Sequence, residues 1–231
     1  MMIKTLLMTG ANNHDWRRSA PFMKKMLEDT GLFEVDMITD PGEFLKDAAK
    51  LKPYALLLLD FNGPDWDDDA KANFTAAVEG GIGLASIHAS NNAFIGWKEF
   101  ESMIGLLWRD GCTHGNYHEF KVAVRTGSHP ITVGMGDFMI RDELYAGLVN
   151  PQGVPFQVLA TAYSIPEQNG SGKDEPAAIA LNYGKGRVFQ SILGHAARGI
   201  AGDPLPTFEN GDFQRLLIRG CEWAATGSVT N

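Results

Sequence analysis

The stretch GLASIHAS, residues 83–90, joins a short buried strand to a polar turn. Every residue from 83 to 87 is apolar or small, as in the inner strands of parallel sheets. Small residues flank His88 two positions away on either side, a pattern typical of a sharp strand-to-helix turn that exposes its central side chain. The stretch therefore predicts a strand, an elbow with His88 at its tip, and a helix at about 95–104.

The same alternation of strand and helix extends outward from this elbow. Further strands are predicted at residues 3–9, 33–38, 54–59 and 188–193, and further helices at 19–30, 70–79 and 212–225. The acidic residues 65–69 suit a solvated helix start better than a metal site. Repeated βα units predict an α/β fold: a three-layer, doubly wound, mostly parallel sheet of flavodoxin-like type.

The pattern changes after residue 105. A loop rich in Gly, His and Trp runs to 116, and strands are predicted at 117–125, 156–163 and 177–181. Residues 129–132 and 183–186 are predicted turns, the second a hairpin that lacks the longer phosphate-loop pattern. This region is expected to form an antiparallel edge or an insertion.

Length, composition and charge favour one domain, residues 1–231, with a small-molecule partner. The net charge of −8 argues against a nucleic-acid partner. The first apolar run is too short for a signal peptide or membrane span, so no membrane partner is expected. Cys112 and Cys221 lack the spacing of a zinc or redox motif, and a reducing cytoplasm is the predicted setting. A homo-oligomer is compatible with the sequence.

Three histidines each follow a predicted strand: His14, His88 and His195. In a parallel sheet they lie on one rim, where imidazoles can act as a general base, a general acid or metal ligands. His88 and His195 are the candidate metal ligands, and the site could accept zinc, manganese or no metal at all. The alternative is that each ring is structural and satisfied by backbone carbonyls. Ser90 reads as a helix cap better than as a nucleophile.

Further candidates lie in the irregular region. Glu143, preferred over Asp142, could orient an imidazole, move a proton or complete a metal site; the alternative is a solvated surface turn. Trp108 and His114 suit a carbohydrate pocket, because an aromatic face packs on sugar C–H groups. His118 is expected on a strand face and His129 in a structural turn. Asn13, Trp108 and Tyr145 are the predicted substrate contacts.

With these segments placed, the chain resembles the ThuA-like family over nearly its whole length. The resemblance rests on the order and spacing of Gly10 to His14, Gly83 to His88, HPIT at 129–132, DELY at 142–145, and GKGRV at 184–188 leading to Leu193-Gly194-His195. The family is similar in fold to class I glutamine amidotransferases, whose elbow carries a cysteine. Here that place holds His88, so glutamine hydrolysis through a thioester is not expected.

The resemblance implies a role in the use of trehalose and related disaccharides, on 3-keto disaccharides or 3-keto glucosides. The implied reaction is that of a lyase, hydrolase or isomerase, with His88 and His195 as metal ligands or acid/base groups. Glu143 would transfer a proton or orient, supported by His14 and His114. The alternative is a non-catalytic carbohydrate-binding or regulatory module on the same fold. An ordinary two-carboxylate glycosidase ranks last, since no second acid is identified.

Overall fold

The computed structural model describes residues 2–127, 129–197 and 205–230. Within these residues one sheet has nine strands: β1 (Ile3–Met8), β2 (Phe33–Ile38), β3 (Leu56–Leu59), β4 (Gly83–Ile87), β6 (His118–Val124), β7 (Phe138–Asp142), β9 (Gln157–Tyr163), β10 (Asp174–Tyr183) and β11 (Gly186–Ser191). Their order across the sheet is β2-β1-β3-β4-β11-β10-β9-β6-β7. A second, two-stranded sheet pairs β5 (Thr113–His114) with β8 (Tyr145–Ala146).

The large sheet has a parallel part and an antiparallel part. Strands β2, β1, β3, β4 and β11 pair in parallel. From β11 onward each neighbour reverses, through β10, β9, β6 and β7. Two reversals restore the original direction, so β9 and β7 run the same way as the parallel strands. The carboxyl ends of β1, β4, β11 and β7 therefore face one edge of the sheet.

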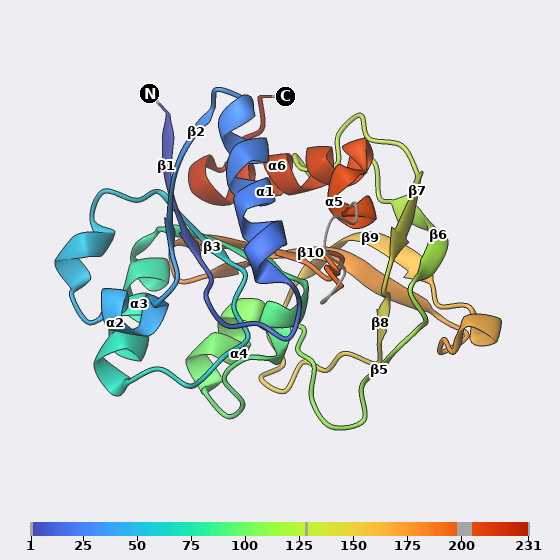
Figure 1. The fold of residues 1–231 in the computed structure, drawn as a ribbon, viewed down its shortest axis with the longest axis horizontal. Helices are drawn as coiled ribbons and strands as arrows, with labels where there is room; N and C mark the ends of the chain where they lie inside the picture. Colours follow the sequence, from blue (N-terminus) through green and yellow to red (C-terminus); the bar gives the residue numbers. More distant parts are fainter. Residues whose placement is uncertain (1, 128, 198–204, 231) are drawn as a thin grey trace.

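Helices cover both faces of this sheet. One face carries α1 (Trp16–Asp29), α5 (Pro206–Glu209) and α6 (Gly211–Thr226); the other carries α2 (Pro41–Leu45), α3 (Asp68–Gly80) and α4 (Lys98–Ile104). In Figure 1 the first group lies in the upper half of the view and the second in the lower half. Short 3₁₀ turns are η1 (Ala48–Leu51), η2 (His88–Asn92) and η3 (Pro166–Gln168).

The four leucines of β3 show how the sequence builds two cores from one strand. Successive side chains of a strand point to opposite faces. Leu56 and Leu58 join the core under α1 and α6, whereas Leu57 and Leu59 join the core under α3 and α4. All four are fully buried, which explains the continuous apolar run.

The predicted α/β class, the mostly parallel sheet and the antiparallel edge are confirmed. The helix predicted at 95–104 begins only at Lys98, because Phe94 and Gly96 have φ of 52° and 85°, outside the helical region. The turn predicted at 183–186 does join β10 to β11. β5, β7 and β8 were not predicted as strands, nor were α2 and α5 predicted as helices. None of the helices in the described ranges is long and apolar enough to cross a membrane.

Candidate active site

The elbow after β4 holds His88 in an unusual backbone conformation. Its φ is 45°, in the left-handed region that residues with a side chain rarely adopt. Gly194 packs against this turn, and a Cβ there would lie 2.7 Å from Ile87 Cγ2 and 3.2 Å from His88 Cβ. A residue larger than glycine at 194 would displace the elbow. The sharp turn predicted for 86–90 is therefore present and held by close packing.

Ser90 is structural rather than a free hydroxyl. Its side chain is fully buried, and its Oγ donates to the Leu59 carbonyl at 2.9 Å and accepts from the Phe61 amide at 3.0 Å. These bonds fasten the elbow to the end of β3. The hydroxyl proton is committed to a carbonyl, which leaves Ser90 unsuited to nucleophilic attack.

Four side chains from four strand ends converge beside the elbow. His14 follows β1, His88 follows β4, Glu143 follows β7 and His195 follows β11. One ligand atom from each lies within 4.8 Å of every other. Glu143 Oε2 lies 3.8 Å from Nε2 of His14, 3.8 Å from Nε2 of His88 and 3.1 Å from Nδ1 of His195. The three histidines lie together at the edge of the sheet where they were predicted, and Glu143 lies beside them.

His88 is oriented by the backbone of the neighbouring strand. Its Nδ1 lies 2.6 Å from the Ile192 carbonyl oxygen, which can only accept, so Nδ1 carries the ring proton. Burial and the nearby His14 lower the pKa of His88 to about 3. The ring is therefore neutral at pH 7, and its Nε2 presents a lone pair to the cluster.

The two carboxylate oxygens of Glu143 have different partners. Oε1 lies 2.8 Å from Nδ1 of His114, and Oε2 lies 3.1 Å from Nδ1 of His195. Burial alone would raise the pKa of Glu143, but the contacts with His14, His195 and His88 outweigh it and hold the pKa well below its ordinary value. Glu143 is thus a half-buried anion among imidazoles.

Asp142 fixes the backbone on both sides of the cluster. Its Oδ1 accepts from the amides of Glu143 at 2.6 Å and His195 at 3.1 Å, and its Oδ2 accepts from the Gly194 amide at 2.8 Å. Its carboxyl is fully buried, and burial raises its pKa to about 7 against these hydrogen bonds. Asp142 therefore joins the loop after β7 to the loop after β11.

A second buried aspartate supports the loop that carries His14. Asp60, at the end of β3, accepts from Asn12 Nδ2 at 2.7 Å and from Ser19 Oγ at 2.9 Å. The Asn12 amide oxygen in turn accepts from the His14 backbone amide at 3.0 Å. Burial raises the pKa of Asp60 to about 6. The neighbouring Asp15 amide donates to the Ala196 carbonyl at 2.9 Å, which joins this loop to that of His195.

A pocket of about 250 Å³, which we call the histidine pocket, opens directly onto the cluster. Its lining is Asn13, His14, Ala89, Asn92, Trp108, His114, Glu143 and Tyr145. The rings of Trp108 and Tyr145 meet edge to face with centroids 4.7 Å apart, and Tyr145 stacks on His88 at 4.2 Å. The three side chains predicted to contact substrate thus share one pocket with three of the predicted catalytic residues.

Other predicted candidates lie elsewhere. His118 begins β6, as expected of a strand residue, and its Nδ1 contacts the Asn116 carbonyl at 2.7 Å. His129 packs edge to face on Trp223, with ring centroids 4.5 Å apart, in a structural turn. Cys221 is fully buried in α6, and Cys112 Sγ contacts the Gly147 carbonyl at 3.1 Å.

Sequence reasoning missed two contributors and ranked a third too low. Tyr117, whose ring centroid lies 5.1 Å from that of His195, carries no motif that could have singled it out. Asp60 ends a predicted strand, and that position was its only signal. Asp142 was weighed as an alternative to Glu143, yet the two carboxylates have distinct places: one binds backbone amides, the other faces the imidazoles.

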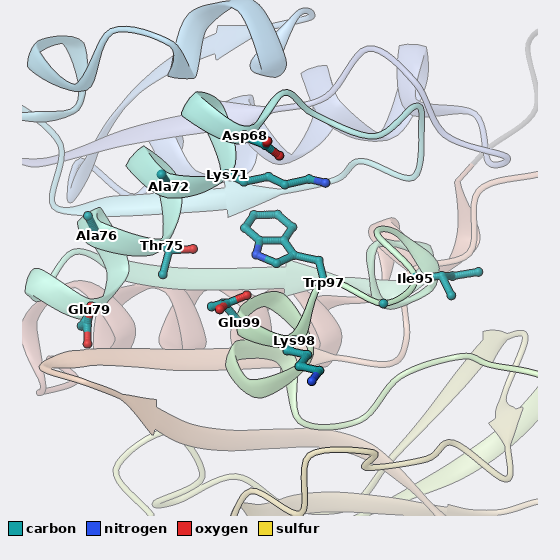
Figure 2. Close-up of a pocket in the computed structure, with 11 residues that line it drawn as sticks. Asp68, Lys71, Ala72, Thr75, Ala76, Glu79, Ile95, Trp97, Lys98 and Glu99 are labelled. Atoms are coloured by element: carbon teal, nitrogen blue, oxygen red, sulfur yellow. The ribbon is translucent and has the colours of Figure 1, made fainter.

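A larger hollow of about 700 Å³ lies between α3 and the start of α4. Figure 2 shows Lys71, Thr75 and Glu79 projecting from α3 toward Trp97, Lys98 and Glu99. Lys71 Nζ lies 5.7 Å from the centre of the Trp97 ring. We call this hollow the α3–α4 groove; it shares no lining residue with the histidine pocket.

The fold and the site define an α/β protein with a large, mostly parallel sheet, whose carboxyl edge gathers three histidines and a half-buried glutamate. The family model described as "ThuA: Trehalose utilisation" matches residues 4–224, and the chain belongs to this family. A ThuA-like protein from Parabacteroides merdae is similar to it at 36% identity, with a TM-score of 0.90, over 100% of this chain and 92% of that one.

More distant structures share the fold. A ThuA-like protein from Bacteroides uniformis has a TM-score of 0.73 at 19% identity, covering 98% of this chain and 94% of its own. A cytoplasmic protein from Salmonella typhimurium LT2 has a TM-score of 0.66 at 14% identity, covering 96% of this chain and 99% of its own. None of the curated proteins compared with the chain matches it.

Proposed function

We propose that this protein acts on 3-keto disaccharides or 3-keto glucosides in sugar catabolism, as a lyase, hydrolase or isomerase. The observation that carries the proposal is the contact of His114 Nδ1 with Glu143 Oε1, 2.8 Å, in a pocket lined by aromatic rings. The family's association with trehalose utilisation supplies the substrate class. The elbow carries an imidazole where the glutamine amidotransferases of similar fold carry a thiol, which argues against glutaminase chemistry.

The proposed chemistry begins with removal of a proton. A ketone at C3 acidifies the C–H bond at C2, and a base that takes this proton leaves an enolate. Elimination then breaks the C1–O bond, and a proton goes to the departing oxygen. Later addition of water to the unsaturated product would complete a hydrolysis. Delivery of the proton to C3 instead, with transfer of the C2 hydroxyl proton to the C3 oxygen, moves the ketone to C2 and gives an isomer.

His114 is the side chain best placed for this base. Its Nδ1 faces two acceptors, Glu143 Oε1 and the Gly115 carbonyl, each at 2.8 Å, so Nδ1 carries the proton and Nε2 keeps the lone pair. A carboxylate behind Nδ1 orients an imidazole and stabilises the imidazolium that forms. The side chain is 48% exposed and lines the pocket, whereas His88 is 2% exposed. His114 is therefore promoted from a supporting role.

Glu143 serves better as an anchor than as the base. Its pKa lies well below the ordinary value because several imidazoles surround it, so it holds a proton poorly at neutral pH. An ionised carboxylate at this place fixes His114 on one oxygen and His195 on the other. We therefore assign Glu143 the orienting role among those predicted for it.

The pocket walls suit one sugar ring. Trp108 and Tyr145 offer aromatic faces that pack on sugar C–H groups. Asn13 is exposed at the rim, and its amide oxygen accepts from Asn62 Nδ2 at 2.9 Å, which leaves its amide nitrogen for a sugar hydroxyl. The volume of about 250 Å³ lies just below the range of about 300 to 1,000 Å³ that is usual for ligand sites, which suits a ligand no larger than a single ring. We place the reaction in the cytoplasm, in keeping with the description of the Salmonella structure.

The test is a turnover assay on 3-keto-trehalose and simple 3-keto-glucosides, followed by NMR in D₂O. We expect exchange or loss of the C2 proton, and the product identifies the reaction as elimination, hydrolysis or isomerisation. His114→Ala should lower kcat roughly 100-fold to 10,000-fold, the usual contribution of a general base. His118→Gln, outside the pocket, is the matched control and should keep full turnover.

Two outcomes would contradict the proposal. Wild-type protein that binds these sugars without turning them over would be a non-catalytic carbohydrate-binding module on the same fold. Full turnover by His114→Ala would show that His114 is not the base. The role of base would then belong to one of the imidazoles deeper in the cluster.

A further inference from the structure

We propose that His14, His88, His195 and Glu143 bind one divalent first-row transition metal ion, with zinc the ion that this ligand set fits best. The inference deepens the function proposed above. It rests on that function only for the identity of the molecule on which the ion would act. His88 and His195 are the two residues that the sequence analysis assigned as metal ligands, and it named His14 and Glu143 as groups that could join them. His14 and Glu143 come from strand ends far apart in the chain and are placed beside them by the fold.

The distances between the four groups suit a shared ion. Metal–ligand distances to imidazole nitrogen and carboxylate oxygen are about 2.0 to 2.2 Å, so two ligands of one ion lie at most about 4.4 Å apart. The four ligand atoms lie within 4.8 Å of one another, and three of the separations from Glu143 Oε2 are 3.8, 3.8 and 3.1 Å. Ligands of a tetrahedral zinc ion lie about 3.4 Å apart, so side-chain rotations that bring the widest pair closer by roughly 1 to 1.5 Å complete the site.

The arrangement of lone pairs calls for a cation. Nδ1 of His88 donates to the Ile192 carbonyl, so Nε2 turns its lone pair toward Glu143 Oε2, another acceptor, 3.8 Å away. In the described part of the chain, Nε2 of His88 has no hydrogen-bond partner, and its side chain is 2% exposed. Two acceptors at this distance, one buried and one half-buried, repel, and a metal ion between them would remove that cost.

The surrounding contacts hold the ligands as second-sphere groups hold them at known metal sites. The carbonyl on His88 Nδ1 fixes the tautomer that leaves Nε2 for the ion. His114 binds the other oxygen of Glu143, and Asp142 holds the backbone of Glu143 and His195. Because His14 and Glu143 line the pocket, a bound ion would lie at its base. There it would act as a Lewis acid on a substrate carbonyl.

The ligand chemistry selects the class of ion. Calcium and magnesium prefer all-oxygen ligand sets, which three imidazoles do not supply. Zinc, cobalt and nickel accept imidazole readily, and manganese is favoured by carboxylate and water. A set of three imidazoles with one carboxylate therefore ranks zinc ahead of manganese and excludes the hard ions.

The experiment measures metal binding without substrate. Tag-free protein is stripped with a chelator and titrated with Zn²⁺, Mn²⁺ and Mg²⁺ by calorimetry, with metal content determined by elemental analysis. Co²⁺ provides an optical spectrum that reports on its ligands. We expect one zinc ion per chain, no Mg²⁺ binding, and a melting temperature raised by zinc.

Variants assign the site. Glu143→Gln keeps the shape of the side chain and removes its charge, and His88→Ala removes one imidazole; each should weaken zinc binding by roughly 100-fold or more. His114→Ala, which loses only the orienting contact, should weaken it by about 10-fold to 100-fold. His118→Gln is the matched histidine control and should bind zinc as the wild type does. Circular dichroism checks folding, and Glu143→Gln decides the matter if His88→Ala does not fold.

The outcomes separate this inference from the proposed function. Zinc binding that is substoichiometric, or unchanged in Glu143→Gln and His88→Ala, overturns the metal site. Stripped protein that turns over 3-keto sugars at the full rate leaves the proposed function standing and removes the ion from it. Stoichiometric zinc in a protein without turnover supports the metal site and contradicts the enzymatic function.

Discussion

The α3–α4 groove is larger than the histidine pocket, but it is the pocket that opens onto the cluster of histidines. The groove encloses about 700 Å³ and the pocket about 250 Å³. The groove is lined by side chains of two adjacent helices that project outward (Figure 2). The pocket opens onto a cluster of four side chains from four strand ends, whose ligand atoms lie within 4.8 Å of one another.

This difference teaches that convergence, not volume, marks the candidate site. A groove between two surface helices arises wherever helices pack over a sheet, and its charged residues are solvated. Bringing three imidazoles and a carboxylate together inside the protein requires desolvating them, which costs free energy, and clusters of this kind are characteristic of functional sites. The predictions that follow test whether function depends on the small pocket and is indifferent to the large groove.

The largest effect is expected from Asp142→Ala. Three backbone amides lose their acceptor, and each buried amide left without a partner costs about 1 to 3 kcal/mol. The loops after β7 and β11 would also lose their common anchor, so turnover should fall at least as far as in His114→Ala. Chemical denaturation and the 3-keto-sugar assay measure the two effects. Glu119→Ala, on the exposed side of β6, is the control; equal stability of the two variants would show that Asp142 is no anchor.

A pH-dependent stability difference is expected from Asp60→Asn. The pKa of Asp60 is raised to about 6 by burial, from an ordinary 3.8, so the folded state favours the protonated acid. Its contribution to stability is therefore complete below about pH 4 and is lost as the pH rises through 6, by up to about 3 kcal/mol. The asparagine variant should lack this part of the pH profile.

The comparison is made by urea denaturation of both proteins from pH 4 to 8. The difference in unfolding free energy between wild type and Asp60→Asn should change between pH 4 and 6 and level off above 7. A constant difference across this range would show that Asp60 has an ordinary pKa.

A smaller effect is expected from Trp108→Ala. Removal of the aromatic face should raise KM about 10-fold, in line with about 1.4 kcal/mol of lost packing on sugar C–H groups, with kcat nearly unchanged. Steady-state kinetics on a 3-keto-glucoside separates the two constants. A fall in kcat with KM unchanged would place Trp108 in the chemistry instead of in binding.

No effect on turnover is expected from filling the α3–α4 groove. Thr75 lines the groove on α3, and Thr75→Trp would occupy much of it. Sugar turnover and zinc affinity should match those of the wild type, after the melting temperature has been checked. Loss of either would show that the groove, despite its solvated lining, takes part in function.

Strand and helix periodicity predicted most of the α/β framework because buried strands leave continuous apolar runs. The leucines of β3 and the segment before His88 are such runs. The same logic placed His14, His88 and His195 at one edge, since parallel strands end together. The order of the motifs along the chain indicated the family.

The antiparallel part was less predictable for equally physical reasons. β7 is a five-residue strand that alternates buried and exposed residues next to an acidic motif, and β8 has only two residues. Neither strand is long enough to leave a pattern that identifies it in the sequence. That Asp142 would turn inward to bind backbone amides while Glu143 turned to the imidazoles depends on the pairing of distant strands, which no local pattern records.

The four converging residues lie at positions 14, 88, 143 and 195, each on a loop that follows a different strand. No two are neighbours in the chain, so the cluster exists only after strands from both halves of the sequence have paired. A partly folded or partly synthesised chain holds imidazoles scattered along a polymer, with low affinity for metal or sugar. The site therefore forms only when the sheet is complete. A functional assay on this protein consequently also measures the fraction of molecules that have folded.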